Sequence, residues 1–247
     1  MVERVEPVMG IPVRALVRDR AVPPGALDAA FAWLRWVDVT FSPYDPRSEV
    51  SRIRRGELAV GCAHPEVRSV LWRCERLRRR TGGAFDVGFA GPPDPTGVVK
   101  GWAAERAAAG LEAAGLRDFC LDAGGDVVAR GGPWRVGIRH PHARDRLCGA
   151  LVLGDGAVAT SGAYERGAHI RDPRTGRAPA GVESVTVTGP DLGTADAFAT
   201  AAFALGTDGP AFTAGLRGYE AMTVLAGGRV LTTPGWARRA APLEAAA

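Results

Sequence analysis

The sequence lacks the features that would assign it to several broad classes of protein. No apolar run approaches the roughly 20 residues of a membrane-spanning helix, so no membrane span is expected. The first eight residues contain acids and a proline where a signal peptide needs an uninterrupted apolar stretch, which favours a cytoplasmic protein. Without internal repeats, low-complexity tracts or a linker, residues 1–247 are expected to form one domain, with a core from about 9 to 236 and a frayed C-terminal tail.

Cysteine and lysine are both scarce. Cys62, Cys74, Cys120 and Cys148 show no CxxC spacing and no histidine at zinc-finger spacing, so neither a zinc site nor a disulfide framework is expected. We interpret the four cysteines as small buried hydrophobes. Lysine occurs once, at Lys100, so arginine supplies the other 30 of the 31 basic residues.

The motifs of common nucleotide-binding and nucleophilic folds are also missing. The chain contains neither a Walker A motif nor a GxGxxG after a strand. Thr160-Ser161-Gly162 lacks the strand–elbow–helix context of GxSxG, so a serine nucleophile is not predicted there. The net charge is +4, but the arginines alternate with acids along most of the chain. We therefore interpret the densest runs, at 54–55 and 78–80, as solvated faces and not as a nucleic-acid patch.

The hydrophobic pattern changes along the chain. Apolar residues spaced by three or four predict helices from about Leu27 to Phe41, Pro65 to Arg80, Val99 to Ala114 and Ala195 to Leu205. Alternation between Gly-rich turns predicts strands at 12–18, 119–121, 126–129, 134–138, 150–153, 184–188, 219–225 and 229–232. Helices early and strands late favour an α+β fold with a mostly antiparallel sheet and packed helices.

The late helix contains a candidate metal site. Asp196 and Thr200 are four residues apart and therefore share one helical face, one turn apart. A carboxylate beside a hydroxyl offers the hard oxygen donors that Mg²⁺ prefers. The alternative is that the helix dipole alone favours an acid in the first turn while the threonine hydroxyl bonds back to a carbonyl.

A second candidate segment leads into the third predicted helix. Gly82-Gly83 allow close approach of the backbone to a ligand, and Gly97 is expected just before the helix, where free backbone groups can meet a metal or phosphate. Lys100, in the first turn, opposes the helix dipole, which suggests an anionic partner. An ordinary helix-start loop is the alternative.

The histidines are few. His169 precedes a turn formed by Asp172-Pro173 and Thr175-Gly176, and an imidazole there can accept a proton from a hydroxyl near neutral pH. A structural role for this lone histidine is the alternative. His140 and His142, on either side of a proline, are expected in an exposed loop.

Short motifs in a fixed order give the strongest indication of function. They are Phe-Ser-Pro-Tyr-Asp-Pro-Arg-Ser-Glu-Val at 41–50, Gly-Gly-Ala-Phe-Asp at 82–86, Val-Val-Lys-Gly-Trp at 98–102, Ala-Gly-Gly-Asp at 123–126, Ala-Thr-Ser-Gly-Ala-Tyr-Glu-Arg at 159–166, His-Ile-Arg-Asp-Pro-Arg-Thr-Gly at 169–176, Ser-Val-Thr-Val at 184–187 and Ala-Asp-Ala-Phe-Ala-Thr at 195–200. In this order they resemble the ApbE family, the FAD:protein FMN transferases, from about Met9 to Trp236.

The resemblance implies a single α+β domain with a pocket for FAD and a site for Mg²⁺. Positions that match the family's flavin-nucleotide contacts are Met9, Tyr44, Ala84, Phe85, Asp86, Asp94, Lys100 and Arg171. Positions that match its magnesium ligands are Asp196, Thr200 and the main-chain carbonyl of Gly97. His169 matches the residue that activates the acceptor hydroxyl.

The implied reaction is the transfer of FMN from FAD to a Thr or Ser hydroxyl of an acceptor protein, with release of AMP. Such a transfer depends mainly on positioning and charge neutralisation. Lys100 would add a positive charge and His169 would accept the hydroxyl proton. Family acceptors carry a short motif with Asp, then Ser or Thr, then Gly-Ala and the modified Thr or Ser.

Two departures from the family pattern keep other functions open. Asp94 follows Asp86 after only eight positions, where longer members carry an insertion that bears on the seating of the adenine half of FAD, and Pro95 stands at a commonly apolar position. The alternatives are an FAD hydrolase that makes FMN and AMP, and a non-catalytic FAD carrier. Many members are exported lipoproteins, whereas this sequence shows no leader or lipobox cysteine, so either this is a cytoplasmic member or the leader lies outside the given sequence.

Overall fold

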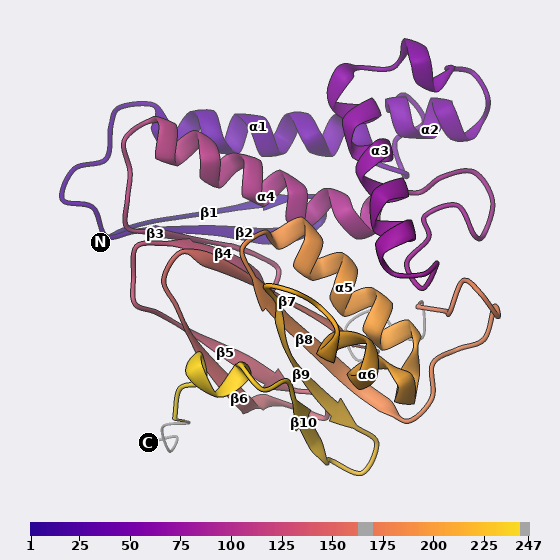
Figure 1. Cartoon of the computed structure of the whole chain (residues 1–247). Coiled ribbons are helices and arrows are strands. Elements are labelled where there is room, and N and C mark those ends of the chain that lie inside the picture. The colour runs from indigo at the N-terminus through magenta and orange to yellow at the C-terminus, as the bar shows by residue number, and fades with distance from the viewer. Residues whose placement is uncertain (163–169, 243–247) are drawn as a thin grey trace.

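A single antiparallel sheet of eight strands forms the frame of the molecule, whose computed structural model describes residues 1–162 and 170–242. The strand order is β1-β2-β3-β4-β7-β8-β9-β10, and β5 and β6 form a separate antiparallel hairpin (Figure 1). The strands are β1 Val2–Val8, β2 Ile11–Val17, β3 Phe119–Ala123, β4 Asp126–Arg130, β5 Trp134–His140, β6 Ala143–Leu153, β7 Gly156–Gly162, β8 Val182–Gly189, β9 Glu220–Leu225 and β10 Val230–Thr232.

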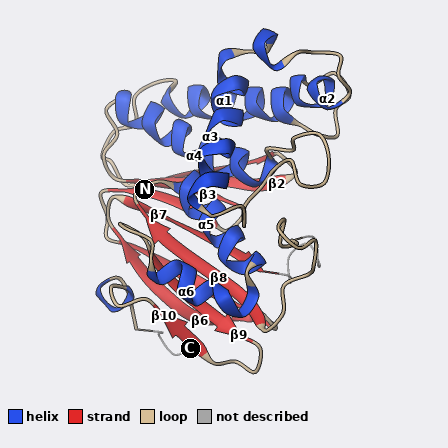
Figure 2. Cartoon of the chain, turned by 45° about the vertical axis from the view of Figure 1, so that its right-hand side comes forward, coloured by secondary structure: helices blue, strands red, loops and turns tan. Residues whose placement is uncertain are grey.

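Helices cover one face of this sheet, and the β5–β6 hairpin covers part of the other (Figures 1 and 2). The helices are α1 Ala26–Phe41, α2 Glu49–Arg54, α3 Pro65–Arg80, α4 Thr96–Ala113, α5 Leu192–Ala204 and α6 Gly209–Ala214. On β3, Phe119 and Leu121 point into the helix-side core, while Cys120 between them belongs to a second core under the hairpin. Strand alternation therefore supplies apolar side chains to both faces.

Helices α4 and α5 are the innermost helices. Nearly all of α5 is buried, and α4 is buried from Val98 to Ala104 except at Lys100. A helix that is apolar on all sides has to be surrounded by protein. Here α5 packs against β7, β8 and α4, and α4 packs against α1 and α5. These two helices carry all three residues predicted to bind metal.

The predicted α+β class with a mostly antiparallel sheet is confirmed, and the four predicted helices are present. The third helix begins at Thr96 and not near Val99, so Gly97 lies inside its first turn and Lys100 lies just beyond that turn. Both positions differ from the sequence-based expectation. The strands β1 and β7 and the short helices α2 and α6 were not predicted.

The expectations for the cysteines, the C-terminal tail and membrane spans can each be compared with the structure. Cys74 and Cys120 are buried, and burial raises the pKa of each thiol to about 12, but Cys62 is exposed, contrary to the expectation of a buried hydrophobe. Ala241, at the start of the expected frayed tail, is held in place, because its N–H donates to the Ala150 carbonyl at 2.8 Å, and residues 243–247 of that tail lie outside the described residues. None of the described helices has the length and apolar character needed to cross a bilayer.

The arginine runs are largely ion-paired. Arg55 pairs with Glu57 at 2.6 Å, and Arg78 and Arg79 share Glu75 at 2.7 and 2.8 Å. These pairs are exposed and contribute little stability. They lower the positive charge that the runs present to solvent.

Candidate functional site

Two adjoining cavities open where the start of α4 meets the sheet. The first has a volume of about 550 Å³ and the second about 440 Å³, and Ile11, Asp94, Thr96 and Lys100 line both. Residues lining only the first include Ala84, Phe85, Asp86, Gly97, Ser161, Arg171, Asp196 and Thr200. Residues lining only the second include Met9, Asp38, Phe41, Ser42 and Tyr44. Every described residue predicted to bind nucleotide or metal therefore lines one of the two cavities.

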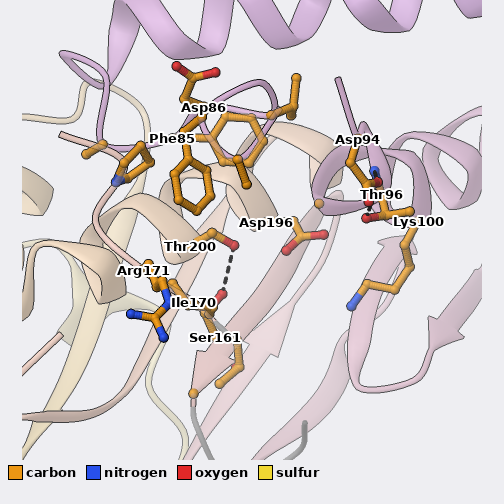
Figure 3. A pocket seen from close by; sticks show the side chains of 18 of the residues that line it. Phe85, Asp86, Asp94, Thr96, Lys100, Ser161, Ile170, Arg171, Asp196 and Thr200 are labelled. Atoms are coloured by element: carbon orange, nitrogen blue, oxygen red, sulfur yellow. Dashed lines mark hydrogen bonds between the residues drawn. The ribbon is translucent and has the colours of Figure 1, made fainter. Parts of the chain in front are cut away.

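The candidate metal ligands meet in the first cavity. Asp196 is only 6% exposed, and Thr200 lies one turn further along α5 (Figure 3). The Thr200 hydroxyl is 3.1 Å from the Ser161 hydroxyl of β7. Gly97 approaches from α4. A carboxylate, a hydroxyl and a nearby backbone form a set of hard oxygen donors suited to Mg²⁺.

Two glycines bring α4 and α5 close enough to assemble this group. A Cβ on Gly101 would lie 3.0 Å from the Gly193 Cα and 3.1 Å from the Leu192 carbonyl oxygen. The helices thus cross backbone to backbone, which only glycine permits at this position. One turn before Gly101, a Cβ on Gly97 would lie 3.3 Å from the Phe85 ring, so Gly97 keeps the predicted contact residue Phe85 against the helix start.

Lys100 has an anionic partner within the protein. Its ammonium nitrogen lies 2.5 Å from Oδ2 of Asp126, a residue that is 2% exposed. The other oxygen of Asp126 accepts the N–H of Thr160 at 3.2 Å. Asp126 therefore compensates the charge that the sequence analysis attributed to an external anion, and the cationic helix start is not by itself evidence of a ligand. Lys100 nonetheless lines both cavities.

Asp94 shapes the entry into α4. Its Oδ1 accepts the backbone N–H of Thr96 at 3.1 Å and the Thr96 hydroxyl at 2.8 Å, which caps the helix start. Its Oδ2 accepts from Arg54 of α2 at 2.9 Å. Arg54 also lines the first cavity, although the sequence analysis treated it only as part of a charge run. Arg54 lies far from the other site residues in the sequence, so no motif or spacing indicated that it would line the cavity.

Residues 172–176 form a tight turn beside the first cavity, closed by the Gly176 N–H, which donates to the Asp172 carbonyl at 2.7 Å. Asp172 accepts bonds from Arg174, one of them at 2.8 Å, and these bonds lower the pKa of the Asp172 carboxyl. Arg171 lines the cavity and donates to the Gly176 carbonyl at 3.2 Å. The candidate base His169 lies outside the described residues, so its role remains a prediction.

The second cavity holds the remaining predicted contacts. Met9 lies at the turn between β1 and β2, and Tyr44, after α1, is 93% exposed at the cavity wall. Phe41 beside them is buried. Apolar and aromatic walls of this kind suit a flat ring system.

Ser161 was considered only as a nucleophile and rejected, and the structure supports that rejection because Ser161 lies within a strand. Its contact with Thr200 gives it a place in the cavity that the motif did not predict.

Among the described residues no three His, Cys, Asp or Glu side chains gather as a metal cluster. A metal here would depend on one carboxylate, on neutral oxygens and on the ligand's own phosphates.

Comparison with known proteins shows which enzymes this chain is similar to. A 39% identical relative, the FAD:protein FMN transferase of Rhodobacter capsulatus, matches 55% of this chain, and the match spans 28% of that protein. The corresponding enzyme of Treponema pallidum is 34% identical over 60% of this chain and 48% of its own length. The matches therefore span less than half the length of these relatives.

Solved structures match over almost the whole chain. The crystal structure of the ApbE protein from Thermotoga maritima has a TM-score of 0.84 at 26% identity and covers 96% of this chain and 98% of its own. The flavin transferase ApbE from Vibrio cholerae has a TM-score of 0.83 at 22% identity, which shows a shared fold. The model of the ApbE family matches residues 9–91 and 94–223, so this chain belongs to the ApbE family.

Proposed function

We propose that this protein transfers FMN from FAD to a Ser or Thr hydroxyl of an acceptor protein and releases AMP. The observation that carries the proposal is the convergence of segments distant in sequence, from Met9 to Thr200, on two adjoining cavities. Their combined size suits a dinucleotide better than a single ring system. Membership of the ApbE family and the names of the relatives support the same reaction.

The chemistry assigned to the chain is mostly positioning. The acceptor oxygen forms a bond to the FMN-side phosphorus of FAD, and the bond from that phosphorus to the bridging oxygen breaks, so that AMP leaves with the electron pair. We assign His169 to accept the hydroxyl proton. Lys100, which is paired with Asp126, lines both cavities, and we propose that its ammonium group also contacts the diphosphate at their junction.

We propose that Asp196, Thr200 and the Gly97 carbonyl hold Mg²⁺ in the first cavity. The donor set fits this ion, since the nearly buried Asp196 carboxylate and the Thr200 hydroxyl both line the cavity that Gly97 lines from the opposite helix. When bound, the ion would neutralise charge that develops on the phosphates. The chain's own part is to keep these oxygens in place through the close crossing of α4 and α5.

The direct test uses FAD, Mg²⁺ and a peptide that carries the family acceptor motif, analysed by mass spectrometry. We expect the peptide to gain FMN and AMP to appear in equal amount. AMP that forms at the same rate without peptide would identify an FAD hydrolase, the alternative suggested by the short segment from Asp86 to Asp94. FAD that stays bound to the protein and unchanged in every reaction would identify a carrier and would reject the proposal.

The metal site is tested by Asp196→Ala. Loss of the only carboxylate assigned to the metal is expected to lower Mg²⁺-dependent transfer by about 100-fold or more, because an electrostatic contribution of several kcal/mol disappears. Asp196→Asn keeps the side-chain volume and is expected to lose a similar factor. Circular dichroism melts verify folding, and wild-type rates in the folded Asn variant would remove Asp196 from the metal site.

A further inference from the structure

The turn between β1 and β2 has an unusual residue at its tip. Val8 pairs with Ile11, which leaves Met9 and Gly10 as a two-residue hairpin turn with φ values of 55° and 72°. Positive φ at both positions is typical of a type I′ turn, which prefers Asn, Asp or Gly. Among the described residues, Met9 is the only non-glycine with positive φ. A long side chain in this conformation destabilises the turn.

An aspartate from a different element holds this turn. The Met9 backbone N–H donates to Oδ2 of Asp38 at 3.0 Å, across 29 positions of sequence. Asp38 lies on α1 between the buried core residues Val37 and Phe41, so its backbone is fixed by packing. Both Met9 and Asp38 line the second cavity. The hydrogen bond thus ties the hairpin tip to the helix that forms the facing part of the cavity wall.

The unfavourable backbone conformation of Met9 and its position in the wall of the second cavity together indicate a role in ligand binding. Residues in sparsely populated backbone regions concentrate at ligand sites, where the surroundings hold them in place. Methionine has a flexible, polarisable side chain that adapts to a flat ring. Met9 already matches a flavin-nucleotide contact through the family resemblance, and we propose that Asp38 is the positioning residue that fixes the strained Met9 turn and so holds this contact in place before the dinucleotide binds. This inference rests on the proposed function, because FAD is the ligand.

The test measures FAD affinity and thermal stability in the same variants of the full chain. Met9→Asn creates the preferred Asn-Gly turn but removes a side chain that packs against the core, so the two effects oppose each other and we expect the melting midpoint to fall by no more than about 2 °C. The same change removes the apolar contact with the ligand, and we expect FAD to bind about tenfold more weakly. Much weaker binding with nearly unchanged stability is an outcome that a purely structural role for Met9 does not produce.

Asp38 is tested through the hydrogen bond that it accepts. Asp38→Ala is expected to raise KM for FAD about tenfold with kcat unchanged, because the turn loses its anchor but the reacting groups remain. Asp38→Asn keeps an oxygen acceptor and is expected to restore most of the affinity. Asp28→Ala is the matched control, since Asp28 lies on the same helix, is 76% exposed and pairs with Arg4 away from the cavities.

The outcomes separate this inference from the proposed function. Wild-type protein that binds and uses FAD, together with Met9→Asn binding FAD as the wild type does, would overturn the role of Met9. Equal KM values for Asp38→Ala and Asp28→Ala would overturn the role of Asp38. Wild-type protein that binds no FAD at all would overturn the proposed function and this inference with it.

Discussion

At the scale of single residues, the aspartates around the two cavities differ in what surrounds them. Asp94 accepts from Arg54, Asp126 from Lys100 and Asp172 from Arg174. Replacing any of these three breaks an ion pair and disturbs local structure, so lost activity there does not by itself identify a ligand contact. Asp196 lines the first cavity from α5 together with Thr200, the other side chain proposed to hold the metal, which is why the metal test uses this residue.

The Asp172–Arg174 pair gives a prediction about pH. Because Arg174 lowers the pKa of Asp172 in the folded protein, the pair contributes stability above the unfolded-state pKa of about 3.9, and the contribution disappears as pH falls through the lower folded-state value. Arg174 is 44% exposed, so solvent screening limits the effect to about 1 kcal/mol or less. Asp172→Asn is therefore expected to lower the free energy of unfolding near neutral pH and to match the wild type once the pH is below the folded-state pKa of Asp172.

Urea unfolding at several pH values measures this difference. Arg174→Gln should give the same pH-dependent loss, and the double variant should lose no more than either single variant, because both remove one interaction. A difference between wild type and Asp172→Asn that persists unchanged into acid would contradict the assignment to this ion pair.

At the scale of elements, the sequence predicted those helices and strands whose hydrophobic pattern is regular. The helix α3 was predicted with its observed bounds because its apolar residues repeat at helical spacing between a proline and two glycines. Strand β7 was missed because its residues, Gly-Ala-Val-Ala-Thr-Ser-Gly, are buried on both faces and show no alternation. The short helix α2, which supplies Arg54 to the site, is too short for a periodic signal.

The sequence predicted those parts of the site that lie within one element, and it did not predict contacts between separate elements. Asp196 and Thr200 lie on one helix, so their proximity followed from helical geometry. The contacts of Lys100 with Asp126 and of Met9 with Asp38 join separate elements, and no local pattern specifies such pairs. The resemblance to a family named the cavity residues, but it did not indicate which of them are held by other parts of the chain.

The crossing of α4 and α5 gives the prediction for this scale. In Gly101→Ala the new methyl group would meet the Gly193 backbone, so the helices must separate, with an expected loss of about 1 to 3 kcal/mol in stability. The same displacement moves Gly97 away from Asp196, and a misplacement of about 1 Å is expected to lower transfer about 100-fold.

Gly110→Ala is the matched control because Gly110 lies in the same helix and an added Cβ meets nothing within 4 Å. We expect this variant to gain about 0.5 to 1 kcal/mol and to keep wild-type activity. Thermal melts and transfer assays compare the two variants. If Gly101→Ala kept both wild-type stability and activity, the close crossing would not be what positions the metal ligands.

At the scale of the whole molecule, the two cavities lie at the boundary between the helices and the sheet. Their walls come from the β1–β2 turn, the end of α1, the segment leading into α4, strand β7 and helix α5. A ligand that contacts all of these binds the folded state alone and must stabilise the molecule as a unit. Binding is therefore measurable as a shift of the global melting transition.

The shift of the melting midpoint can distinguish binding of Mg²⁺ from binding of the flavin ring. At about 100 times its Kd, FAD with Mg²⁺ is expected to raise the melting midpoint by about 5 to 10 °C, and EDTA is expected to remove a large part of that shift. Riboflavin carries the flavin ring without phosphates, so any shift that it causes should be the same with Mg²⁺ or EDTA. In Asp196→Asn, the FAD shift should also become independent of Mg²⁺. A Mg²⁺-dependent FAD shift of wild-type size that survives in this variant would show that the ion does not need Asp196, because no other carboxylate of the proposed metal set remains to bind it.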